Sequence, residues 1–135
     1  MFTKTMTYTD YNGNERVEDF YFNFTTAEIA EMELSTKGGL EGEIKAITNE
    51  MDGAKIVAWF KKIILQSVGK KTPDGKRFVK SKEISEEFAQ TEAYSQLFME
   101  LAFDAEKGAE FINSIIPTIP DDKKPKISTN VKAIS

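Results

Sequence analysis

Four carboxylates stand close together in the sequence, at Glu83, Glu86, Glu87 and Glu92. Grouped carboxylates can bind a cation or act as paired general acid and base. A calcium loop, however, needs a glycine and oxygen ligands at fixed spacings, and this segment lacks that pattern. Acidic residues also favour the first turns of helices, because they stabilise the helix dipole. We therefore interpret the four glutamates as parts of helices and expect no metal site.

The chain contains neither histidine nor cysteine among its 135 residues. Histidine is the commonest general base, and histidine and cysteine together supply ordinary zinc sites and most catalytic triads. An enzyme of this composition would have to use carboxylates, lysine, tyrosine or a metal held by oxygen ligands. The composition therefore favours a binding protein that is not an enzyme, with no catalytic residues and no cofactor.

Basic residues concentrate in the middle of the chain, at Lys61, Lys62, Lys70, Lys71, Lys76, Arg77, Lys80 and Lys82. Such a cluster can neutralise the phosphates of a nucleic acid. Only one of the eight is arginine, the residue that makes most bidentate base contacts, and no aromatic and glycine-rich RNA motif accompanies them. We therefore disfavour nucleic acid as a partner and expect a solvated segment that faces acidic helices of the same chain or of a neighbour.

The glycine-rich segment Gly38-Gly39-Leu40-Glu41-Gly42 resembles a phosphate-binding loop only superficially. It lacks the Gly-Lys-Ser/Thr ending and a preceding buried strand. A break between helices explains these glycines better.

The N-terminal residues alternate in the manner of a β-hairpin. Residues 2–9 place Thr at every odd position and mostly apolar residues at the even ones, and residues 16–24 place Phe at positions 20, 22 and 24. Asn12-Gly13 between them is a strong tight-turn signal, because both residues tolerate positive φ. A lone hairpin is only marginally stable, so its aromatic face must pack on the helices downstream or on another subunit.

Helical spacing dominates after the hairpin. Thr25 and Glu28 form a predicted capping box for a first helix that ends near Leu34, and a second short helix is expected over residues 40–50. Asp52 is expected to cap the main core helix, in which Trp59 and Phe60 are expected to be buried. Thr72-Pro73-Asp74-Gly75 predicts a turn with short strands beside it, and helices follow from Ser81 and from Asp104 to Pro117.

These patterns predict an α+β fold with a β-hairpin at residues 2–24 and four to five helices within residues 25–116. Residues 1–117 are expected to form one globular domain. Residues 118–135, rich in Pro, Lys, Ser and Asn, are predicted to be a disordered tail. No apolar run reaches the roughly 18 residues that span a membrane, and no secretory signal is evident, so we expect a cytoplasmic protein.

Charge and apolar surface suggest where a partner would bind. Residues 1–50 carry a net charge of −6, residues 61–82 of +7 and residues 83–110 of −7. The last helices also carry more apolar residues than a small monomer easily hides. The candidate protein-interaction residues are Lys70, Lys71, Lys76, Arg77, Lys80, Phe98, Phe103, Phe111 and Ile115.

Four stretches of the chain resemble one family of viral proteins. They are Tyr8-Thr9-Asp10-Tyr11-Asn12-Gly13-Asn14-Glu15, Glu18-Asp19-Phe20-Tyr21-Phe22-Asn23, Thr91-Glu92-Ala93-Tyr94-Ser95-Gln96-Leu97-Phe98 and Ala109-Glu110-Phe111-Ile112-Asn113-Ser114-Ile115-Ile116-Pro117. They are similar to tail assembly chaperones of siphoviruses and prophages of Gram-positive bacteria.

The resemblance implies a small, mainly helical chaperone that coats the tape measure protein and recruits tail tube subunits during virion morphogenesis. It also implies oligomers that act in the host cytoplasm and are absent from the mature virion. The alternative, from a different class, is a small virus-encoded inhibitor of a host enzyme or nucleic-acid complex, whose acidic helices would imitate phosphates. A third reading is a carboxylate-based enzyme, which the missing histidine and cysteine disfavour.

Overall fold

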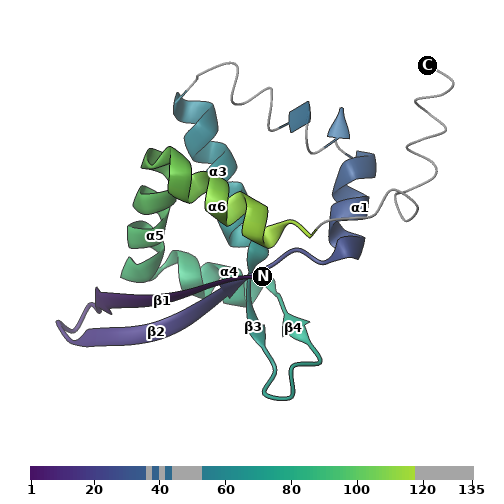
Figure 1. Ribbon diagram of the computed structural model, residues 1–135. Helices are drawn as coiled ribbons and strands as arrows, with labels where there is room; N and C mark the ends of the chain where they lie inside the picture. The colour runs from purple at the N-terminus through teal and green to yellow at the C-terminus, as the bar shows by residue number, and fades with distance from the viewer. Residues whose placement is uncertain (36–37, 40–41, 44–52, 118–135) are drawn as a thin grey trace, which may run out of the picture.

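The computed structural model describes residues 1–35, 38–39, 42–43 and 53–117, and the chain has an α+β fold. Figure 1 shows the order of its elements. They are β1 (Phe2–Thr9), β2 (Glu15–Phe22), α1 (Thr26–Ser35), α3 (Gly53–Ser67), β3 (Val68–Lys71), β4 (Phe78–Val79), α4 (Lys82–Ala89), α5 (Glu92–Phe103) and α6 (Ala105–Ile115). The short helix expected over residues 40–50, the cap at Asp52 and the tail lie wholly or largely outside the described residues.

The N-terminal hairpin is confirmed. β1 and β2 pair antiparallel from Phe2↔Phe22 to Thr9↔Glu15, and Gly13 takes a positive φ of 82° in the turn. The Asp10 carboxylate holds the turn: one oxygen accepts from the N–H groups of Asn12 and Asn14, and the other accepts from Arg16 at 2.7 Å. The even-numbered side chains of β1 lie on the covered face and its threonines on the exposed face, as the alternation predicted.

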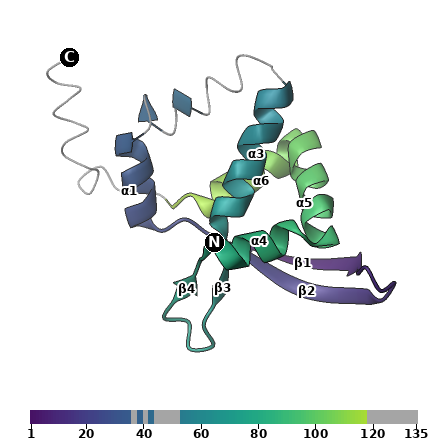
Figure 2. The ribbon, with the colours of Figure 1, turned by 180° about the vertical axis from the view of Figure 1, so that it is seen from behind.

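The short strands expected beside the Thr72–Gly75 turn are present as β3 and β4, but the sequence did not predict that they extend the sheet of the first hairpin. Its strand order is β1-β2-β3-β4, and all neighbours are antiparallel. β3 pairs with β2 only at Tyr21↔Gly69 and Phe22↔Val68, and then turns away to form its own hairpin with β4. Figures 1 and 2 show the β1–β2 hairpin and the β3–β4 hairpin extending from the body in different directions.

Side-chain caps begin four of the described helices, and those of α1, α4 and α6 lie where the sequence predicted a helix start, whereas the start of α5 at Thr91 was not predicted. Thr25 and Glu28 form the reciprocal capping box, with distances of 2.9 and 3.1 Å. Ser81 and Thr91 each accept from the backbone three residues later, and they start α4 and α5. Asp104 accepts from the N–H groups of Glu106 and Lys107 and starts α6.

The core lies where the helices meet the covered face of the sheet. The Phe22 ring makes edge-on contacts with Phe88 and with Phe111, with centroids 5.6 and 5.5 Å apart. Trp59 is buried, as predicted, but Phe60 keeps part of its ring exposed, so the expectation of full burial was wrong for that residue. α3 contributes four buried residues, yet its outer side stays open to solvent.

Among the described residues, no helix combines the length and the apolarity that crossing a membrane requires.

Candidate protein-interaction surfaces

The β3–β4 hairpin presents most of the candidate basic residues to solvent. Lys70, Lys71, Lys76 and Arg77 are all exposed. A hydrogen bond closes the turn between the strands: Gly75 has φ 76°, and its N–H donates to the Thr72 carbonyl at 2.8 Å. Hydrogen bonds from the Thr72 hydroxyl and the Lys76 N–H lower the pKa of Asp74. The turn therefore keeps Asp74 charged. The exposed side chains of Lys76 and Arg77 form the basic tip of the hairpin.

Lys80 has a different role from the other candidates. Its ammonium forms an ion pair with Glu28 at 2.5 Å, donates to the Asn23 carbonyl at 3.0 Å and lies 4.6 Å from the centre of the Phe24 ring. Only 18% of its side chain is exposed. Burial alone would raise the pKa of Glu28, but the contacts with Lys80 and Thr25 outweigh it and lower that pKa. Lys80 therefore ties the start of α1 to the second hairpin.

The candidate apolar residues divide between core and surface. Phe111 and Ile115 are fully buried, so no surface of the folded chain presents them. Phe98 is partly buried beside Tyr94, with ring centres 5.9 Å apart. Phe103 is 68% exposed.

Sequence reasoning missed Met99, which lies one helical turn before Phe103 on α5 and is 57% exposed. The spacing of four residues could have identified the pair, because residues i and i+4 share a helix face.

Polar contacts fix the face that α5 turns outward. Glu100 binds Lys4 of β1 at 2.9 Å and Lys107 of α6 at 3.2 Å. Burial raises the pKa of Glu100, but the two lysines outweigh that effect and lower it. The Gln96 side chain also donates to the Thr7 carbonyl at 3.2 Å. α5 is therefore held against the sheet, with Met99 and Phe103 left open to solvent.

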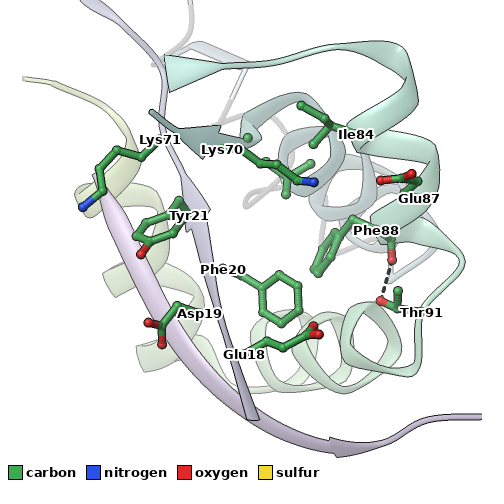
Figure 3. A pocket seen from close by; sticks show the side chains of 12 residues that line it. Glu18, Asp19, Phe20, Tyr21, Lys70, Lys71, Ile84, Glu87, Phe88 and Thr91 are labelled. Atoms are coloured by element: carbon green, nitrogen blue, oxygen red, sulfur yellow. Dashed lines mark hydrogen bonds between the residues drawn. The ribbon is translucent and has the colours of Figure 1, made fainter. Parts of the chain in front are cut away.

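A groove of about 560 Å³ lies where β3 diverges from β2, with α4 beside it. Figure 3 shows Phe20 and Phe88 at its apolar floor, with ring centres 5.1 Å apart. The charged residues around it come from three elements: Glu18 and Asp19 from β2, Lys70 and Lys71 from β3, and Glu87 from α4. No local sequence pattern could predict this groove, because it exists only where two strands separate.

The clustered glutamates form no metal centre in the part of the chain that the structure describes, where no group of three potential ligands converges. Glu83, Glu86 and Glu87 are exposed on α4, and Glu86 lies 3.8 Å from Lys82 one turn earlier.

The comparisons with known proteins identify the family of the chain. The family model for phage tail assembly chaperones matches residues 1–126. Searches of curated proteins and of solved structures found no match. The family match spans the hairpin, every described helix and the surfaces above, so the protein belongs to the phage tail assembly chaperone family.

Proposed function

We propose that this chain binds the tape measure protein of a siphovirus and helps to recruit tail tube subunits during tail assembly. Membership of the chaperone family indicates a role in tail assembly by binding rather than catalysis. The tape measure and tail tube as partners follow from the resemblance of the four sequence stretches. On this proposal the protein acts in the host cytoplasm in many copies and leaves before the virion is complete.

The exposed pair of Met99 and Phe103 on α5 is the observation that carries the proposal. They are 57% and 68% exposed and lie one turn apart on α5, whose opposite side is buried at Ala93, Leu97 and Leu101. A helix-rich client with exposed apolar faces can pack against such a strip. Methionine suits this contact because its flexible side chain adapts to different partners.

Self-association is the second part of the proposal. The exposed basic tip of the β3–β4 hairpin and the acidic helix α4 lie on one molecule, so copies can meet through opposite charges. Exposed ion pairs are individually weak and are screened over about 8 Å at physiological salt. Apolar contacts must therefore supply most of the affinity, while the charges select the orientation.

Client binding is tested by measuring the affinity of the purified chain for the tape measure protein. Phe103→Asp should weaken binding by roughly 10- to 150-fold, because burying a Phe side chain is worth about 1.5–3 kcal/mol. Tyr11→Asp is the matched control, since Tyr11 is 78% exposed in the hairpin turn. An equal loss of affinity in both variants, or a loss in neither, would contradict the assignment of Met99 and Phe103 to the binding surface.

Self-association is tested by light scattering over a range of protein and salt concentrations. Reversal of both Lys76 and Arg77 to Glu should reduce assembly while leaving stability nearly unchanged, because both residues are exposed. The same reversal at Lys61 and Lys62 on α3 is the charge-matched control. A strict monomer at high concentration, in low and in high salt, rules out self-assembly and favours the inhibitor alternative.

A further inference from the structure

One edge of β2 lacks a strand partner along most of its length. β2 pairs with β1 over all eight residues, but β3 covers only Tyr21 and Phe22 on the other side. The Asn23 N–H donates to the Ser67 carbonyl at 2.9 Å, so the odd-numbered residues direct their backbone groups toward β3. Glu15, Val17 and Asp19 continue that series, and no described strand faces them.

The opposite edge of the hairpin, formed by β1, is covered, unlike the open edge of β2. α5 lies along β1, and Gln96 donates to the outward-facing Thr7 carbonyl. Proteins usually cover, charge or shorten exposed strand edges, because free N–H and C=O groups attract other strands. The open edge of β2 is about 20 Å long, at roughly 3.4 Å per residue.

The groove beside this edge defines what can bind there. Phe20 and Phe88 provide an apolar floor on the covered face of the sheet. Glu15 and Asp19 line the exposed face of the same edge. An additional strand would therefore need apolar side chains on one face and basic side chains on the other, because facing residues of neighbouring strands share a face.

The C-terminal sequence has this pattern. Ile127, Thr129, Val131 and Ala133 alternate with Lys126, Ser128, Asn130 and Lys132, and residues 123–135 include four lysines and no acidic residue. Alternation of β-branched and polar residues is typical of a half-buried strand. Such a segment is too short to be stable alone and would become ordered only against another strand, whereas composition alone predicted a disordered tail.

We propose that residues 126–133 bind along the Glu15–Phe20 edge of β2 in the same chain, as an additional antiparallel strand. With Ile127 opposite Phe20, Ile127 would cover the Phe20–Phe88 floor and Val131 would lie on the same face, opposite Arg16. Lys126 and Lys132 would lie on the face of Asp19 and Glu15. This contact closes the open edge of the sheet. A partner that adds a strand to β2 must first displace it.

The chain is long enough for this contact. The Phe24 N–H donates to the Ile115 carbonyl at 3.1 Å, so α6 ends beside the residue that follows β2 and Asn23. Tyr21, where β3 pairs with β2, is three residues from Phe24, so the Cα atoms of the two residues are at most about 11 Å apart. Residues 118–125 can span roughly 28 Å. A short connection of this kind gives a millimolar effective concentration, which favours the same chain over a second copy.

Amide hydrogen exchange by NMR on the full chain tests the proposal. The Val17 and Asp19 amides should exchange at least about tenfold more slowly than unstructured amides, because a docked strand hydrogen-bonds them. Changing Ile127 and Val131 to Asn should remove this protection. Changing Ser128 and Asn130 to Gln, on the polar face, should preserve it. The Glu18 and Phe20 amides face β1 and report whether the hairpin remains folded.

Three results would overturn the proposal. The first is unprotected Val17 and Asp19 amides in the unchanged chain. The second is protection that survives in the Ile127 and Val131 variant. The third is protection that falls on dilution, which would assign the covering strand to a second copy. All three are measured without a client, so they are independent of tape measure binding.

Discussion

Replacing Lys80 with Met should destabilise the protein, although Lys80 belongs to a basic, mostly exposed segment. The change removes the ion pair with Glu28 and the contact with the Phe24 ring, and it leaves the Asn23 carbonyl without its donor. Each of the first two contributes about 0.5 kcal/mol at a partly exposed site, and the unsatisfied carbonyl costs about 1 kcal/mol. The expected loss is therefore about 2 kcal/mol.

Urea denaturation followed by the fluorescence of Trp59 measures this loss directly. The matched control is Lys76→Met at the exposed tip of the same hairpin, which should change stability by less than about 0.5 kcal/mol. Thermal unfolding of Lys80→Met should show a midpoint lowered by roughly 6–10 °C. If Lys80→Met unfolds at the same urea concentration as the Lys76→Met control, the contacts of Lys80 do not stabilise the fold.

The remaining predictions concern the core, the sheet and acid stability. Trp59→Ala should cost about 3–5 kcal/mol, and native Trp emission at the wavelength of free indole in water would contradict the burial of this side chain. Gly69→Ala should cost about 1–3 kcal/mol in denaturation, because a Cβ there would lie 2.7 Å from the Phe78 ring and 2.8 Å from a backbone oxygen. The pKa values of Glu28 and Glu100 are lowered in the fold, so the stability they contribute is present above the ordinary glutamate value of 4.5 and is lost as pH falls below it. Unfolding free energy measured from pH 7 to pH 3 should fall in that range, and Lys80→Met should reduce the fall; a flat profile would contradict the assigned contacts.

Local signals in the sequence were sufficient to predict the first hairpin and the helix starts. Alternation at residues 2–9 placed every threonine on the exposed face, and Asn12-Gly13 marked the turn. Caps at Thr25 and Asp104 depend only on residues two or three positions away. Such short-range chemistry can be read without knowing the tertiary structure.

Long-range packing explains what the sequence did not reveal. Val68–Lys71 lacks alternation and continues an apolar helix, so its pairing with β2 had no local signal. Lys80 resembled its solvated neighbours, but its environment comes from residues more than fifty positions earlier. Phe103 and Phe111 are both phenylalanines of the last two helices, yet one is exposed and the other is fully buried, because the packing of α5 and α6 decides which face is covered.

Hydroxyl-radical footprinting of the chain, alone and with the tape measure protein, tests the proposed function most directly. Oxidation of methionine and aromatic side chains depends on their exposure, and Met99 and Phe103 are open in the free chain. We expect the tape measure protein to protect Met99 and Phe103 from oxidation, while Tyr11 is oxidised as before. A stable complex in which Met99 and Phe103 stay fully reactive would contradict the assigned surface, and the absence of any complex would contradict the proposed client.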